Sequence, residues 1–326
     1  MQLPPLTRYY FSYMPNKERA CRWLCFGVVV SLVVVLYIFW TPLRSAEFTY
    51  SMVSVTVENV LVFLFFQVIT TLGSEGFFLI FLSAIYWSYN KLLGFWGLVV
   101  MPLSIFVTSE IPKDLIRLPR PDVPGVTVPT YTFPSGHTSG AVSVWGYLAI
   151  MLKQRWLWIG ALVIMFLVGL SRVMLGYHFP GDVLGGIVTG IIFLVIFFSM
   201  GVRLVENNWK EKIGFYQLIC IALIIPLAMS FIPATFAPRL MGYMAGASLG
   251  YLLQKEILNF STVGDWRQHL GRSLLGMSVI AVIIPGFDLV LPEGIHLITY
   301  IQHALATFWS TFLAPWCFIK VGLLHK

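Results

Sequence analysis

The residue types best suited to chemistry in this sequence include the run Pro134-Ser135-Gly136-His137. Ser135 is a favourable helix N-cap, and Gly136 lets a ligand approach the backbone closely. His137 falls in the first turn of a helix, which an apolar run carries on to Leu152. A helix N-terminus offers unpaired N–H groups and the positive end of the helix dipole, and both favour an anion. The run therefore predicts a phosphate-binding turn with a titratable side chain beside it.

Two further polar blocks lie where neighbouring apolar runs begin or end. One precedes this turn and the other follows it, and their chemically capable members are Lys113, Arg120, Ser171, Arg172, His178 and Asp182. Because each block lies at the end of an apolar run, we expect all three to gather at one face of a membrane.

These side chains match what the cleavage of a phosphate ester requires. Negative charge develops on the phosphoryl oxygens, so several fixed cations are favoured over one. Lys113, Arg120 and Arg172 can supply them, and arginine can bind phosphate with two parallel hydrogen bonds. Ser135 and the backbone amide of Gly136 would complete the phosphate cradle.

The predicted nucleophile is His178, paired with Asp182. Residues four apart in a turn or helix start lie side by side. A carboxylate on one ring nitrogen fixes the tautomer and leaves the other nitrogen free to attack phosphorus. Ser171 either assists the phosphate or caps a helix. We expect no metal and no other cofactor, because the sequence contains neither an Asp/Glu cluster nor an H-E-x-x-H motif.

Together the three blocks fill every position of the signature Lys-x6-Arg-Pro, Pro-Ser-Gly-His and Ser-Arg-x5-His-x3-Asp, in that order. The chain therefore resembles the type 2 phosphatidic acid phosphatase superfamily. The signature spans 113–182, and the helix pattern from about residue 24 to 205 is also similar. The resemblance implies a phosphohistidine intermediate on His178, with His137 protonating the departing oxygen and later activating water.

The composition is that of an integral membrane protein. Of 326 residues, 58% are hydrophobic and 11% are charged, whereas soluble domains carry about 25% charged residues. The net charge of +7 resides in short loops between apolar runs, which is typical of membrane topology and argues against a nucleic-acid partner. The expected partners are the bilayer and a lipid phosphate, while the oligomeric state is left open.

We predict an all-α protein with about ten transmembrane helices. A six-helix phosphatase core would occupy 1–205 and a four-helix extension 206–326. The predicted spans are Leu24–Thr41, Glu75–Tyr89, Leu92–Ser109, Gly136–Leu152, Trp156–Leu175, Asp182–Met200, Gly214–Phe231, Leu240–Ile257, Leu274–Leu291 and Ile301–Leu323. Phe48–Leu72, which polar residues interrupt, is predicted to be a surface or re-entrant helix.

Lysine and arginine placement predicts the orientation of these spans. Most of the 21 basic residues fall on the cytoplasmic side if both termini are cytoplasmic. The catalytic blocks then lie at the extracytoplasmic face, and the five prolines between Lys113 and His137 keep that segment out of lipid. We expect a bacterial inner-membrane location.

The extension shows one pattern of its own. Gly242, Gly246 and Gly250 recur every four residues along one predicted helix face. Small residues at this spacing are typical of close helix–helix packing, so we expect a structural contact there and assign no chemistry to the extension.

The sequence leaves the substrate open. The resemblance implies a lipid phosphate or diphosphate, of the phosphatidic acid, phosphatidylglycerol phosphate or undecaprenyl (polyprenyl) diphosphate type. The added helices and the tripeptide His178-Phe179-Pro180 are also similar to glucose-6-phosphatase. A non-catalytic headgroup binder or transporter is the alternative from another class. The intact pair of His178 and Asp182 argues against it, because binding alone needs no oriented nucleophile.

Overall fold

The computed structural model describes residues 58–123, 130–206, 213–290 and 294–325, with the single residues 45, 49, 53 and 56. Over these residues the chain is nearly all helical, apart from loops and one isolated bridge between Ser261 and His325. The α-helices are α4 Val60–Thr71, α5 Glu75–Ser88, α6 Lys91–Ile105, α7 Ile111–Ile116, α8 Gly136–Leu152, α9 Arg155–Met174, α10 Pro180–Glu206, α12 Phe215–Ser230, α13 Ala237–Leu253, α14 Trp266–Val290, α15 His296–Phe308 and α16 Ala314–Lys320. Three π-helical turns extend some of them: η2 Phe106–Glu110, η3 Gln254–Leu258 and η4 Trp309–Leu313.

Several helices begin and end close to where the sequence predicts. α8 has the predicted bounds: Ser135 occupies its N-cap position, and Lys153 ends it with a left-handed φ of 54°. α5 and α9 differ from prediction by no more than a residue at either end. The predicted first span, Leu24–Thr41, lies outside the described residues.

The helix that leads into the first polar block is longer than predicted. The prediction ended it at Ser109 and placed Lys113 in a loop. Instead, α6 continues through η2 into α7 and stops at Arg117, whose φ is 55°. Pro112 lies in the first turn of α7, directly after the π-helical turn, and the helical path continues through it. Lys113 is therefore held on a helix, and the proline-rich loop begins after it.

α14 also begins earlier than predicted, at Trp266 and not at Leu274. The cause is a reciprocal cap. The Asp265 carboxylate accepts a hydrogen bond from the Gln268 N–H at 2.8 Å, and the Gln268 side chain accepts one from the Asp265 N–H at 3.0 Å. This arrangement satisfies backbone donors at the helix start and extends the helix into a polar sequence.

Four helices of the described chain are long and apolar enough to cross a membrane: Lys91–Ile116, Arg155–Met174, Pro180–Gly201 and Trp266–Phe287. α4 and α5 would add a fifth if they form one span, although a bend of 53° separates them. A bend of this size occurs both in a broken membrane span and in a re-entrant segment, so it does not distinguish between them. The total of about ten spans and the placement of Phe48–Leu72 therefore remain predictions.

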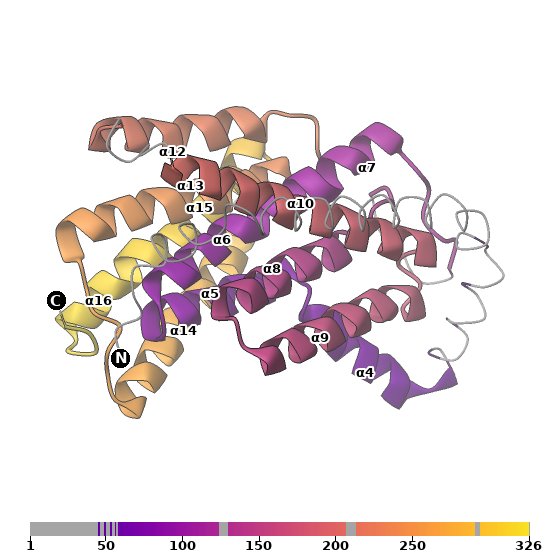
Figure 1. The fold of residues 1–326 in the computed structure, drawn as a ribbon, viewed down its shortest axis with the longest axis horizontal. Coiled ribbons are helices and arrows are strands. Elements are labelled where there is room, and N and C mark those ends of the chain that lie inside the picture. The colour runs from indigo at the N-terminus through magenta and orange to yellow at the C-terminus, as the bar shows by residue number, and fades with distance from the viewer. Residues whose placement is uncertain are drawn as a thin grey trace.

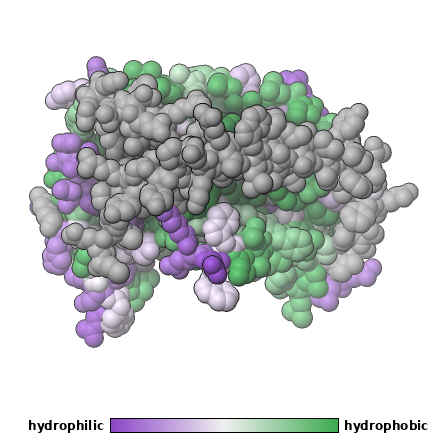
Figure 2. Space-filling model, in the orientation of Figure 1, coloured by the Kyte–Doolittle hydropathy of each residue, from purple (hydrophilic) through white to green (hydrophobic). Residues whose placement is uncertain are grey.

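Large apolar side chains cover much of the outer surface. On α9, Trp156 is 82% exposed and Phe166 67%, and on α12 Ile224 is 63% exposed. In Figure 2, hydrophobic side chains gather at the lower right of the visible face, and hydrophilic ones lie toward the left edge. Apolar surface of this extent is typical of helices that face lipid.

α5 and α6 lie between two groups of helices (Figure 1). α4, α8 and α9 lie on one side, and the C-terminal helices, orange to yellow, lie on the other. Gly94 and Gly246 are two of the points where close contact requires glycine. A Cβ at Gly94 would lie 2.5 Å from the Tyr86 backbone, and one at Gly246 would lie 1.9 Å from the Ala304 carbonyl oxygen. The predicted close contact along the glycine face of α13 is confirmed, and its partner is α15.

Candidate active site

The three polar blocks meet at one end of the helix bundle. The first lies on α7 and the loop after it, the second at the start of α8, and the third at the end of α9 and the start of α10. The backbone joins two of them directly, because the Ser135 N–H donates to the Asp182 carbonyl at 3.0 Å. Residues remote in the sequence thereby form one buried cluster.

A hydroxyl links the imidazole of His178 to the carboxylate of Asp182. The closest approach of His178 Nδ1 to Asp182 Oδ2 is 3.6 Å, which is long for a hydrogen bond. Thr132 Oγ1 lies 3.1 Å from His178 Nδ1 and donates a short hydrogen bond to Asp182 Oδ2. Since that hydroxyl has only one hydrogen, it accepts from Nδ1–H, and the tautomer follows from this network.

Asp182 is itself fixed in place. Its Oδ2 atom also accepts from the Phe179 N–H at 2.9 Å, and the residue is fully buried at the start of α10. A carboxylate at a helix N-terminus is stabilised by the helix dipole. His178, only 2% exposed, is therefore held from its Nδ1 side, and its Nε2 atom carries the lone pair.

Arg120 faces the Nε2 side of the same ring. Its Nη1 atom lies 3.4 Å from His178 Nε2 and donates to the Tyr177 carbonyl at 2.7 Å. Its Nε and Nη2 atoms donate to the carbonyl and hydroxyl of Thr130, each at 2.8 Å. The guanidinium is thus positioned by neutral groups only, and its charge remains available to an anion.

Burial and charge both act on the loop residues of the site. Burial lowers the pKa of His178 well below its ordinary value, and the positive charges of Arg172, Arg120 and Lys113 lower it further. Burial also lowers the pKa of the Arg120 guanidinium. His178 is therefore neutral at physiological pH, which is the state a nucleophile needs.

Arg172 approaches from α9 with donors to spare. Its Nη1 atom donates to Thr70 Oγ1 at 2.8 Å, and its guanidinium lies 4.3 Å from the centroid of the Tyr177 ring. Its buried Nε–H has no hydrogen-bond partner among the residues that the structure describes. An unpaired buried donor on a cation is costly, and a phosphate oxygen would satisfy it.

Lys113 lies beside the start of α8. Its Nζ atom pairs with Glu110 Oε1 at 2.9 Å, and both side chains are buried. A Cβ at Gly136 would lie 3.6 Å from this Nζ and 2.9 Å from Ser109 Oγ. The absence of a side chain at Gly136 therefore keeps the space next to the ammonium group open.

The remaining predicted residues are Ser135 and His137 at the start of α8 and Ser171 near the end of α9, and their hydrogen bonds differ. Ser135 holds the N-cap position, but its side chain caps no backbone N–H and accepts from the Thr138 hydroxyl at 3.0 Å. The imidazole of His137 has no hydrogen-bond partner within the described part of the chain. Ser171 donates to the Val168 carbonyl at 2.6 Å, so its hydroxyl hydrogen is used within α9.

Sequence reasoning missed Thr132 and Glu110. Thr132 had a weak signal, because it is a hydroxyl residue three positions before Ser135. Glu110 lies three residues before Lys113, a helical pairing distance. The prediction ended the helix at Ser109, before both residues, and so this helical spacing was not considered.

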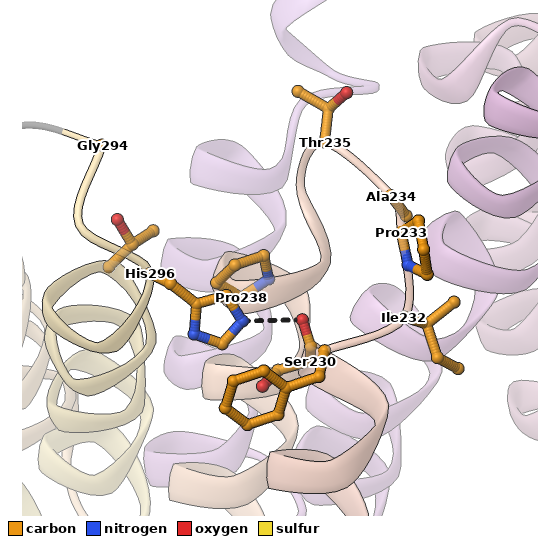
Figure 3. Close-up of a pocket in the computed structure, with 10 residues that line it drawn as sticks. Ser230, Ile232, Pro233, Ala234, Thr235, Pro238, Gly294 and His296 are labelled. Carbon is orange, nitrogen blue, oxygen red and sulfur yellow. Dashed lines mark hydrogen bonds between the residues drawn. The ribbon is translucent and has the colours of Figure 1, made fainter.

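A cavity of ≈ 370 Å³ lies apart from these residues, between the α12–α13 loop and the start of α15 (Figure 3). His296 Nε2 donates to the Ser230 carbonyl at 2.8 Å, and its ring stacks on Phe231 with centroids 4.4 Å apart. None of the predicted site residues lines it, and within the described ranges no group of three or more His, Cys, Asp or Glu side chains could hold a metal ion.

Two family models match the chain. The model described as the PAP2 superfamily matches residues 92–206, which include all three polar blocks. The model described as the transmembrane extension of PAP2 superfamily phosphatases matches residues 238–326.

Curated proteins show the same relationship. Phosphatidylglycerophosphatase B of Bacillus subtilis (strain 168) is 34% identical over 161 residues, or 44% of this chain and 76% of that protein. Undecaprenyl-diphosphatase BcrC of the same organism is 34% identical over 34% of this chain and 55% of its own length. Sphingosine-1-phosphate phosphatase 1 of Mus musculus is 29% identical over 52% of this chain. The match spans only 41% of the length of the mouse protein.

Proposed function

The chain belongs to the PAP2 superfamily of phosphatases, and on that premise we propose that it hydrolyses a membrane lipid phosphate or diphosphate through a phosphohistidine at His178. The main support is the setting of that residue. Thr132 and Asp182 hold its Nδ1 side, and Arg120 faces its Nε2 side at 3.4 Å. A neutral ring held in this way has a lone pair aimed at the place where cations would bind a phosphoryl group.

In the first step, Nε2 of His178 attacks phosphorus and the P–O bond to the leaving group breaks. Lys113, Arg120 and Arg172 stabilise the charge on the phosphoryl oxygens. His137 gives its proton to the departing oxygen, which leaves as an alcohol or, from a diphosphate, as a monophosphate.

In the second step, water attacks phosphorus and the N–P bond breaks. His137, now neutral, takes a proton from the water, so inorganic phosphate is released and the starting protonation states return. Neither step uses a metal ion or an organic cofactor. Ser135 and the Gly136 amide line the phosphate site and reach the same oxygens.

The substrate class follows from the relatives and from the surface. The names of the relatives specify phosphorylated lipids: phosphatidylglycerophosphate, undecaprenyl diphosphate and sphingosine 1-phosphate. The exposed apolar faces of α9 and α12 suit a substrate whose tail stays in the bilayer. We therefore place phosphatidic acid, phosphatidylglycerol phosphate and polyprenyl diphosphates first.

The chain is a multi-pass integral membrane protein, and the orientation is part of our proposal. Both termini would be cytoplasmic and the site extracytoplasmic, in a bacterial inner membrane. Residues 1–205 would form the catalytic core and 206–326 the extension, with about ten spans in total.

The test is phosphate release by the purified protein in detergent, with the lipid substrates above, sphingosine 1-phosphate and glucose 6-phosphate supplied separately and EDTA in excess. We expect release from at least one lipid, loss of it in His178→Ala, and little change in Arg117→Gln, which alters an exposed arginine outside the signature. Preference for glucose 6-phosphate would contradict the lipid assignment. Binding of lipid without release would indicate a headgroup binder, and dependence on added magnesium would contradict the mechanism.

A further inference from the structure

Arg239, on α13 of the extension, forms an ion pair with Glu75 at the first residue of α5. Its Nη2 atom donates to Glu75 Oε1 at 2.9 Å, and its Nε atom lies 2.9 Å from Oε2 without making a hydrogen bond to it. The ring of Phe236 lies 4.1 Å from the guanidinium carbon and supports it from the extension side. No chemical role was predicted from the sequence for either residue.

The turn that carries Glu75 packs against the candidate active site. A Cβ at Gly73 would lie 2.9 Å from the carbonyl oxygen of His137, so this turn touches the first turn of α8. Just before the turn, Thr70 accepts the hydrogen bond from Arg172. The turn therefore connects Arg239 to His137 and to one of the cations of the phosphate site.

A second contact from the same part of the extension reaches the first polar block. The Thr235 N–H donates to Asp114 Oδ2 at 3.1 Å, next to Lys113 on α7. Thr235 lies in the loop that precedes α13, at the edge of the cavity (Figure 3). The extension thus holds the site from two directions.

The charges around His137 come from several elements. Arg172 on α9, His178 in the loop before α10, Lys113 on α7 and Arg239 on α13 all act on it electrostatically. Glu75 interacts in turn with Arg239, Glu110 and Lys113. The extension therefore contributes one positive charge to the surroundings of His137, and Glu75 is the carboxylate paired with that charge.

We propose that Arg239 is a positioning residue for the phosphatase reaction: through Glu75 it fixes the α4–α5 turn against His137 and balances the charge felt by that imidazole. This inference rests on the proposed function, in which protonated His137 is the general acid. It gives the extension a part in the reaction.

The test uses Arg239→Gln, Glu75→Gln, the double variant and the conservative Arg239→Lys in the full-length protein. Arg239→Gln removes a positive charge and should favour protonated His137, so the basic limb of the kcat/KM profile should move to higher pH. Glu75→Gln removes a negative charge and should move the same limb to lower pH. We expect shifts of about half a pH unit or more, in opposite directions, with the double variant close to wild type.

The kinetic constants add an independent measurement. Arg239→Gln should lower kcat by about tenfold or more with little change in KM, because the acid is misplaced while the phosphate cations remain. Arg239→Lys keeps the positive charge, so the basic limb of its kcat/KM profile should lie at the same pH as in the wild-type protein. The matched control is Arg267→Gln, which alters an exposed arginine at the start of α14 whose guanidinium lies 5.4 Å from the centroid of the Trp266 ring. This control should match wild type.

The activity of the wild-type protein distinguishes a failure of the proposed function from a failure of the positioning role. If the wild-type protein releases no phosphate from any lipid, the proposed function is wrong. If it is active and both single variants keep the wild-type pH profile and kcat, the positioning role is wrong. Shifts in the same direction would also overturn it, because they would reflect general damage. If Arg239→Gln does not fold in detergent, Glu75→Gln takes its place, and a wild-type pH profile and kcat in Glu75→Gln contradict the inference.

Discussion

The ring of His178 lies between two unlike environments. The hydroxyl of Thr132 and the carboxylate of Asp182 hold its Nδ1 side, and the Arg120 guanidinium lies at its Nε2 side. The proton is therefore on Nδ1, and the lone pair is on Nε2, where it faces the positive charge of Arg120. Thr132 is the essential link, because the direct distance from Nδ1 to the carboxylate is 3.6 Å.

Replacing Thr132 with valine should expose that dependence. Thr132→Val keeps the shape of the side chain but leaves Nδ1–H without its acceptor. We expect kcat to fall by about 10- to 100-fold, the range seen when a metal-bound histidine loses the group that orients its ring. KM should change little. Thr189→Val is the matched control, because the Thr189 hydroxyl donates to carbonyls of its own helix, α10. Activity of Thr132→Val equal to this control would contradict the role of Thr132.

The acid limb of the pH–rate profile should lie below about pH 6.5, the ordinary value for histidine. The nucleophile must be neutral, and burial lowers the pKa of His178, so the ring stays neutral to a lower pH than usual. The measurement is kcat/KM of the wild-type protein between about pH 4 and pH 8. An acid limb at or above the ordinary value would show that His178 does not titrate as proposed.

Sequence patterns found the three blocks because each has a local spacing tied to a helix end. They could not find Thr132, because the path of a proline-rich loop decides which hydroxyl meets the imidazole. The same limit applies to Arg239. Its partner Glu75 lies 164 positions away, and only the packing of α13 beside α6 brings the two together.

At the scale of helices, hydropathy predicts their presence better than their ends. α8 was predicted to the residue, because Ser135 and Lys153 mark both of its limits. The continuation of α6 into α7 was missed, since it passes through a π-helical turn and then Pro112. A π-helical turn has no clear sequence signal and often occurs at functional sites. Here it ends at Glu110, the residue that pairs with Lys113.

The contact between α13 and α15 makes a second prediction at this scale. In Gly246→Ala the new Cβ would lie 1.9 Å from the Ala304 carbonyl oxygen, and a backbone atom cannot move aside easily. We expect a loss of about 1–3 kcal/mol in the free energy of unfolding, seen as a lower Tm in detergent. Gly286→Ala on α14 is the control, because no atom lies within 4 Å of its added Cβ. Equal Tm values for the two variants would show that the helices are not in close contact.

At the scale of the whole molecule, the site gathers at one end of the bundle, and basic residues predict which side of the membrane that end faces. Two residues, one near each end of the bundle, are suitable positions for labelling experiments that determine the orientation. Arg117 ends α7 beside the site, and Lys153 ends α8 at its opposite terminus; both are exposed basic residues with left-handed φ angles of 55° and 54°. Cysteine at either position would replace one polar surface side chain with another.

Arg117→Cys should react with an impermeant thiol reagent in intact cells, and Lys153→Cys should react only after permeabilisation. Both tests need a background in which the 4 native cysteines are replaced. The expected contrast follows from the positive-inside rule, which places the end with few free basic residues outside. The opposite labelling pattern would mean that the site faces the cytoplasm.

The most direct test of the central claim is detection of phosphate bound to His178. The protein is mixed with a substrate labelled in its phosphate, quenched within one turnover, and assayed for acid-labile phosphate on the polypeptide. p-Nitrophenyl phosphate and a lipid phosphate are compared, because nitrophenolate can leave without a proton, whereas a lipid alkoxide cannot.

Wild type should carry label from both substrates. His137→Ala should form the phosphoenzyme about a hundred-fold more slowly, or worse, from the lipid phosphate. From p-nitrophenyl phosphate it should accumulate label, since the base for hydrolysis is missing as well. His178→Ala should carry none. Acid-labile phosphate on His178→Ala, or equal losses for both substrates in His137→Ala, would contradict the account.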